Sequence, residues 1–218
     1  AHEVKNPLSS IKSIVQVLKE DIKWNEKSGE ALSIIVGEVD RLAKVVNQLL
    51  QFARPAGGRR QNHRLSDVLS GVLLVLRHEA GKNGVTIHQD IPEDIPLINA
   101  EEGALQEVFF NLIHNGIQVM PKGGTLSITT DIDKGNSLKV RVTDTGPGIS
   151  AESVDKIFEP FYTTKQTGTG LGLSIVRKRL EEMGGSVEVE SGPAGTSFVI
   201  KLPIQEGSLS EAAEWVRG

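Results

Sequence analysis

Two asparagines in the sequence have a spacing that suits metal binding. Asn111 and Asn115 lie in the motif NLIHN, within a run of helical periodicity. On a helix both amides would project from one face, one turn apart. Amide oxygens are hard ligands that suit Mg²⁺, which proteins bind through few side chains together with waters and nucleotide phosphates. The pair therefore predicts a magnesium site, while a solvated helix face is the alternative.

A second motif with possible binding chemistry is DTGPGI, residues 144–149, directly after the strand-like segment SLKVRVT. The carboxylate of Asp144 could accept a hydrogen bond from the exocyclic amine of adenine. Gly146 and Gly148 would let the base approach the backbone closely. An ordinary turn at the end of a strand is the competing interpretation of this motif.

A third motif is TGTGLGL, with Gly168, Gly170 and Gly172 just before an apolar, helix-like segment. Glycine-rich backbone ahead of a helix presents N–H groups and the positive end of the helix dipole to a phosphate. Lys165, in the preceding segment FEPFYTTK, could contact phosphate oxygens as a point charge. A flexible loop would explain the same glycines.

In this order the motifs resemble the N, first glycine, F and second glycine boxes of the ATP-binding domain of histidine kinases. The resemblance reaches about Ile204 and is nearest to the nitrogen-regulation-like group of sensor kinases. It implies ATP and Mg²⁺ as cofactors, Asn111 and Asn115 as metal ligands, Asn111 also as a catalytic residue, and an ATP lid hinged on glycines. The ATP-binding residues that it implies are Asn111, Asn115, Asp144, Gly146, Gly148, Lys165, Thr167, Gly168, Thr169, Gly170, Leu171, Gly172 and Thr196.

The opening segment HEVKNPL resembles the phosphoacceptor box of dimeric sensor kinases. A neutral imidazole is a competent nucleophile near neutral pH. Among the five histidines, the resemblance makes His2 the expected phosphate acceptor. The resemblance makes Glu3 the carboxylate that accepts the Nδ1–H of His2 and leaves Nε2 to attack. Asn6, four residues after His2, is expected to orient a water that dephosphorylates a response regulator.

The resemblance implies the catalytic core of a sensor histidine kinase, which phosphorylates itself and then an aspartate of a response regulator receiver domain. The alternatives are a catalytically silent nucleotide-binding scaffold and a gyrase-like ATPase. Hydrolysing relatives carry a glutamate where this chain has Asn111, which argues against the ATPase. Glu107, one turn earlier, receives no catalytic role. Gly116 departs from the alanine that is common after the second asparagine.

The elements that position these residues fall into two regions. Apolar spacing predicts an amphipathic helix from Leu8 to about Ile22, and Ile35, Leu42 and Leu49 recur every seven residues in a second helix. One hairpin cannot cover this stripe, so we expect a homodimeric four-helix bundle. We assign the hairpin to 1–54, a linker to 55–62, an ATP-binding domain to 63–204 and a tail to 205–218.

The second region has an α+β pattern. Residues 66–80 and 101–120 have helical periodicity, and four segments alternate as strands do. The expected strands are residues 125–132, 137–144, 186–190 and 196–203. Helices and strands of this kind pack as a two-layer sandwich.

Composition excludes several function classes. A net charge of −4 gives no basic field for nucleic acid or an anionic membrane, so we expect neither partner. We interpret the short clusters GGRR and RKR as solvated faces. The absence of cysteine favours a reducing compartment, and we expect a cytoplasmic location. The start, AHEVKNPLSSIK, resembles the middle of a helix, so we expect a piece of a longer protein.

Overall fold

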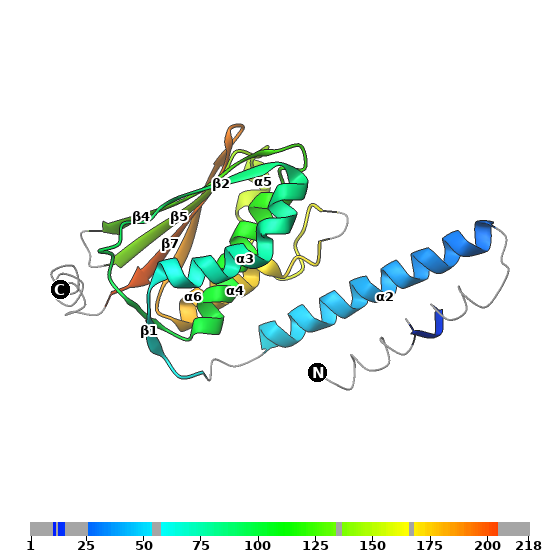
Figure 1. The fold of residues 1–218 in the computed structure, drawn as a ribbon, viewed down its shortest axis with the longest axis horizontal. Helices are drawn as coiled ribbons and strands as arrows, with labels where there is room; N and C mark the ends of the chain where they lie inside the picture. Colours follow the sequence, from blue (N-terminus) through cyan, green and yellow to red (C-terminus); the bar gives the residue numbers. More distant parts are fainter. Residues whose placement is uncertain are drawn as a thin grey trace. The chain divides into compact units, whose positions relative to one another are not determined.

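The structure is a computed structural model that describes residue 11 and residues 13–15, 26–53, 58–133, 137–165 and 168–204. The chain divides into two compact units (Figure 1). One unit comprises residues 1–55 and 161–171, and the other comprises residues 56–160 and 172–218.

The main described element of the first unit is helix α2, Glu26–Ala53, which is 28 residues long. Its leucine and valine side chains at Leu32 and Val39 are buried. The residues of the heptad stripe, by contrast, are exposed to solvent in the single chain. The exposed fractions are 44% for Ile35, 46% for Leu42 and 44% for Leu49. In the part of the chain that the structure describes, no helix combines the length and apolarity needed to cross a membrane.

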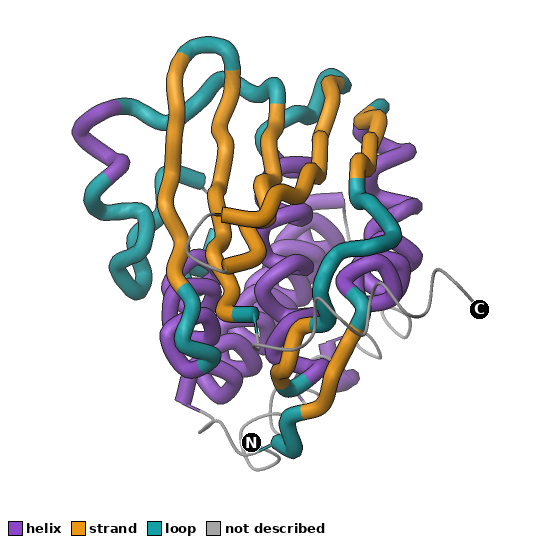
Figure 2. The backbone as a smooth tube through the Cα atoms, turned by 90° about the vertical axis from the view of Figure 1, so that its left-hand side faces the viewer, coloured by secondary structure: helices purple, strands orange, loops and turns teal. Residues whose placement is uncertain are grey.

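The second unit is built on a five-stranded mixed sheet, whose strands are among those drawn in orange in Figure 2. Its strands in spatial order are β2 (Val85–Asp90), β4 (Gly124–Asp133), β5 (Ser137–Asp144), β7 (Gly195–Pro203) and β6 (Ser186–Gly192). Strands β2 and β4 pair in parallel, and the other three pairs are antiparallel.

Three helices cover one face of this sheet (Figures 1 and 2). They are α3 (Leu65–Asn83), α4 (Glu102–Gln118) and α6 (Gly172–Glu182), and α5 (Ala151–Val154) is a single short turn. Helix α4 contacts both α3 and α6 and also strands β4 and β5. Phe109 and Leu112 of α4 and Leu126 and Ile128 of β4 are completely buried. The predicted α+β, two-layer architecture is therefore confirmed.

A separate two-stranded antiparallel sheet lies next to the point where the chain enters the second unit. It consists of β1 (Gln61–His63) and β3 (Ile98–Ala100). Asn62 lies opposite Asn99, whose Nδ2 donates to the side-chain oxygen of Asn62 at 2.7 Å. The sequence did not predict these strands, because three residues are too few for an alternating pattern to be recognised. Two residues that we expected in the linker are thus part of a sheet.

Candidate active site

The asparagine pair lies on α4 beside the first residue of α6. The Nδ2 of Asn111 donates to the backbone carbonyl of Glu107 at 2.8 Å, which leaves Oδ1 as the atom that Asn111 presents to other groups. A Cβ added at Gly172 would lie 3.1 Å from Oδ1 of Asn111 and 3.8 Å from Nδ2 of Asn115. The last glycine of the glycine-rich motif therefore lies against both amides, with little room for a side chain.

Asp144 lies where β5 ends, under the same part of α4. Its carboxylate is buried, and Oδ1 accepts a hydrogen bond from the N–H of Gly146 at 2.8 Å. A Cβ added at Gly116 would lie 3.5 Å from Cβ of Asp144 and 2.5 Å from Cδ1 of Leu126. Helix α4 thus approaches the end of β5 closely at Gly116, and the departure from alanine allows this contact without moving Leu126.

The second glycine of DTGPGI is held against the turn between β6 and β7. Gly148 has φ of 77°, a backbone conformation that favours glycine, and a Cβ there would collide with the carbonyl of Gly192. The N–H of the next residue, Ile149, donates to Oγ of Ser191 at 2.8 Å. The end of the motif is therefore held against this turn through both Gly148 and Ile149.

Thr196 lies on β7, the strand that pairs with β5. In the register of β5 and β7 it lies directly opposite Asp144, and it is buried. Its hydroxyl is 3.0 Å from the hydroxyl of Ser191. Ser191 thus links Thr196 to the loop at Gly148, a role that sequence reasoning missed. Its position just before the turn GPAG was the available signal.

The predicted lid lies in the first unit, and its ends are joined. The N–H of Phe161 donates to the carbonyl of Gly170 at 2.9 Å. Gly170 has φ of 69°, and a Cβ there would collide with the backbone of Phe161. Phe161 itself has φ of 68°, the only positive φ outside glycine among the described residues. Strained backbone of this kind is concentrated at functional sites and switch segments.

Within the lid, the described residues bond to one another. Lys165 donates its N–H to Oγ1 of Thr163 at 3.1 Å, and Gly168 donates its N–H to the carbonyl of Lys165 at 3.2 Å. The hydroxyl of Thr169 accepts the N–H of Leu171 at 3.4 Å. These bonds are local, and the bond between Phe161 and Gly170 joins the two ends of the segment.

The structure therefore gathers the predicted residues into separate groups. Within the second unit, Asn111 and Asn115 meet Gly172, and Asp144 meets Gly146 and Thr196. Other predicted residues lie outside the described residues, and these are His2, Glu3, Asn6 and Thr167.

The interpretation of RKR as a solvated face is wrong for its last residue. Arg179 of α6 is 7% exposed. Its Nε donates to Oε2 of Glu107 on α4 at 2.7 Å, and its Nη1 donates to Oε2 of Glu182 at 2.9 Å. Burial alone lowers the pKa of Arg179, but the hydrogen bonds and charges of the two carboxylates outweigh it and raise the pKa further. The guanidinium is therefore a permanent positive charge within the fold.

The donor set fits magnesium that arrives with a nucleotide. The described residues contain no group of three or more histidine, cysteine, aspartate or glutamate side chains that could hold a metal ion. A cage made of carboxylates is thus absent from this part of the chain. Amide oxygens that supplement phosphate oxygens and waters are a donor set that Mg²⁺ accepts. In such a site, Oδ1 of Asn111 would be the atom that binds the metal.

Two family models match the chain. Residues 100–206 match the model of histidine kinase-, DNA gyrase B- and HSP90-like ATPases. Residues 1–58 match the His Kinase A (phospho-acceptor) domain. Among curated proteins, the sensor histidine kinase ZraS of Escherichia coli is 34% identical over 205 residues, which are 94% of this chain and 44% of ZraS. The chain spans less than half the length of this relative.

Solved structures give the same assignment. Full-length ShkA in complex with AMPPNP matches with a TM-score of 0.76 and 27% identity, over 95% of this chain and 45% of ShkA. The catalytic domain of histidine kinase ThkA matches with a TM-score of 0.60 and 30% identity, over 66% of this chain and 95% of that domain. ThkA in complex with the response regulator protein TrrA matches with a TM-score of 0.70 and 26% identity, over 94% of this chain and 60% of that chain.

The motifs of the sequence, the two-layer fold of the second unit and both family models lead to one assignment. The chain belongs to the sensor histidine kinase family, with a phospho-acceptor region followed by an ATP-binding kinase domain.

Proposed function

We propose that this chain is the catalytic core of a sensor histidine kinase that uses Mg-ATP to phosphorylate His2 and then passes the phosphoryl group to an aspartate of a response regulator. The observation that carries the proposal is that Asn111 and Asn115 of α4 lie against Gly172. Gly116 of the same helix lies against Asp144. In this proposal, the groups around α4 are the candidates for binding metal, phosphate and adenine.

In this reaction the ATP-binding domain contributes mainly positioning and charge neutralisation rather than covalent chemistry. Nε2 of His2 attacks the γ-phosphorus, a P–N bond forms, and the bond from phosphorus to the β–γ bridging oxygen breaks with ADP as the leaving group. Glu3 holds the Nδ1 proton during the attack. Mg²⁺, when bound, neutralises the charge on the phosphates. In the ATP-binding domain, the proposed roles are metal binding for Asn111 and Asn115 and adenine recognition for Asp144.

The two alternative functions have less support. A gyrase-like ATPase would be expected to have a glutamate at position 111 to activate water, and Asn111 cannot act as a base. Glu107 does not replace it, because its carboxylate is engaged by Arg179 at 2.7 Å. A silent scaffold would be expected to have lost a motif, and the motifs are complete.

The proposed reaction is tested by incubating the chain with γ-labelled ATP. Label should appear on the protein only when Mg²⁺ is present, and it should be labile in acid and stable in alkali, as expected for a phosphoramidate. A hydrolysing enzyme would instead release labelled inorganic phosphate without labelling the chain. We also propose a cytoplasmic location, where ATP is available and the absence of cysteine is unremarkable.

We expect the chain to be a homodimer joined through its N-terminal helices. The exposed stripe of Ile35, Leu42 and Leu49 in α2 would be covered by a second copy in a four-helix bundle. Light scattering should give twice the mass of one chain. Leu42→Glu should shift the mass toward one chain, while Ile34→Glu, outside the stripe, should not. An unmodified chain that stays monomeric at high concentration would contradict the bundle.

Asn6→Ala is expected to keep autophosphorylation and transfer but to slow dephosphorylation of the regulator by about 10-fold or more, since one positioned acid–base group typically contributes about 100-fold or more. The amide of Asn6 can both donate and accept, so it can orient a water toward the aspartyl phosphate. The measurement is the decay of labelled regulator after removal of ATP. Equal decay with mutant and unmodified chain would remove Asn6 from the mechanism.

A further inference from the structure

Glu107 of α4 makes two contacts, one within its own helix and one to α6. The backbone carbonyl of Glu107 accepts the Nδ2 of Asn111 at 2.8 Å, and its carboxylate accepts Nε of Arg179 at 2.7 Å. Asn111 in turn lies against Gly172, where α6 begins. Glu107 therefore connects the proposed metal ligand to the body of α6.

The ion pair between these helices is shielded from water. The side chains of Arg179 and Glu107 are 9% and 14% exposed, and Glu182 provides a second carboxylate for the guanidinium at 2.9 Å. An exposed ion pair adds little, because water and salt weaken it and its side chains remain flexible. A buried pair holds one geometry and is costly to break when one partner is removed. This pair is thus suited to fixing the register of α6 against α4.

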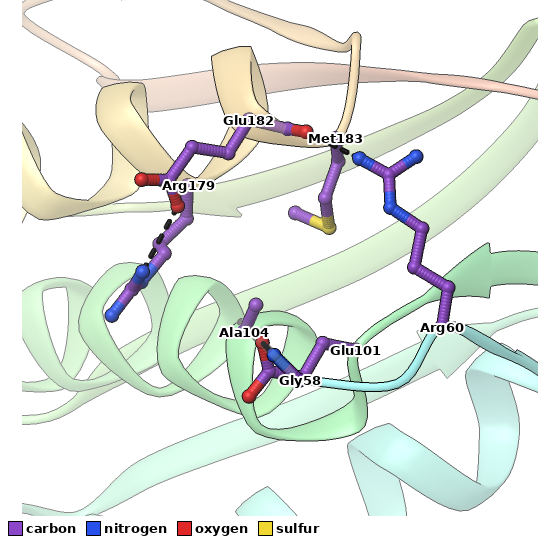
Figure 3. A pocket seen from close by; sticks show the side chains of 7 residues that line it. All are labelled: Gly58, Arg60, Glu101, Ala104, Arg179, Glu182 and Met183. Atoms are coloured by element: carbon purple, nitrogen blue, oxygen red, sulfur yellow. Dashed lines mark hydrogen bonds and ion pairs between the residues drawn. The ribbon is translucent and has the colours of Figure 1, made fainter. Parts of the chain in front are cut away.

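Residues 58–60, at the start of the second unit, lie near the C-terminal end of α6, as Figure 3 shows. Nη2 of Arg60 donates to the backbone carbonyl of Glu182 at 2.6 Å, where a cation is favourable because the helix ends there. The N–H of Gly58 donates to Oε2 of Glu101 at 3.1 Å. These groups line a cavity of about 160 Å³. Because the cavity is small and these groups bond to one another, we interpret it as a structural junction.

We propose that Glu107 and Arg179 are positioning residues that hold Asn111 against the start of α6 and so determine how much affinity for ATP the chain gains from Mg²⁺. The proposal rests on the proposed function, because it takes Asn111 as a ligand of the metal that accompanies ATP. Glu107 acts through its two contacts and touches neither metal nor nucleotide.

The test measures the dissociation constant of ATP with Mg²⁺ and with a chelator, by calorimetry. Arg179→Met should leave binding in the chelator unchanged and reduce the Mg²⁺-dependent gain by about 10-fold, the usual lower cost of losing a residue that orients a metal ligand. Arg179→Lys should restore part of the gain. Lys201→Met is the matched control, since it breaks an exposed ion pair with Glu188 on the sheet and should change neither constant.

Arg179→Met leaves the carboxylate of Glu107 buried without its partner, so this variant is expected to lose stability. The double variant Glu107→Gln with Arg179→Met avoids a charged Glu107 without a partner, and Glu182 keeps Lys178 at 3.8 Å. It should show the same loss of gain with a melting temperature nearer that of the unmodified chain. A folded double variant with the full gain would overturn the proposal. An unmodified chain without any gain would overturn it too. Failure of label to reach His2 would instead count only against the proposed function.

Discussion

His2→Ala is expected to abolish labelling of the chain by γ-labelled ATP and to leave ATP binding unchanged. The proposed acceptor nitrogen disappears with the imidazole, and the replacement has no nucleophile. The candidate metal and adenine ligands belong to α4, β5 and β7, whereas His2 lies in the segment that matches the phospho-acceptor domain, so we expect ATP binding to persist. The measurement is label per chain under conditions where ATP saturates the protein, with the dissociation constant measured separately.

A matched control for this experiment is His88→Ala, which removes an exposed imidazole from strand β2. This variant should be labelled at the rate of the unmodified chain. Label retained by His2→Ala with the same acid lability would move the acceptor to another histidine. Loss of ATP binding in His2→Ala would show that the change disturbs more than the acceptor.

The parts of the fold that sequence patterns predicted are those with a long periodic signal. Helix α4 and strands β4 and β5 have apolar spacings that recur over eight or more residues, and their predicted and observed bounds agree closely. Strands β1 and β3 have three residues each, and their pairing depends on a partner far along the chain. Local periodicity contains no information about such pairs.

The candidate site also divides into residues that local patterns predict and residues whose roles depend on distant contacts. The glycines and asparagines were predicted because their types and spacing reflect local backbone and helix geometry. Ser191 and Arg179 were missed because their roles arise from tertiary contacts, and the partner of Arg179 in α4 is 72 residues away. A basic cluster is usually solvated, so RKR indicated a surface. Only the packing of α6 on α4 shows that one of its arginines faces inward.

Asp144→Asn is expected to weaken ATP binding by about 100-fold, because it removes a charged acceptor that we assign to the exocyclic amine of adenine. Hydrogen bonds to charged groups contribute about 1.5–3 kcal/mol, and each 1.4 kcal/mol is about tenfold in affinity. The asparagine oxygen can still accept the N–H of Gly146, the contact that Asp144 makes at 2.8 Å. The turn should therefore persist while an amide that donates replaces a carboxylate that only accepts.

A suitable control for this change is Asp133→Asn at the end of β4. This carboxylate is exposed, and its ion pair with Lys139 is long, at 4.0 Å. It should leave ATP affinity and melting temperature unchanged.

A nucleotide that lacks the amine, purine riboside triphosphate, separates recognition from damage to the fold. The unmodified chain should bind it much more weakly than ATP, because it lacks the donor that the carboxylate of Asp144 accepts. Asp144→Asn should bind the two nucleotides with similar affinity, since the interaction between the two altered groups is then absent from both complexes. If Asp144→Asn still prefers ATP as strongly as the unmodified chain does, another group recognises adenine, and the buried carboxylate serves only to hold the turn at Gly146.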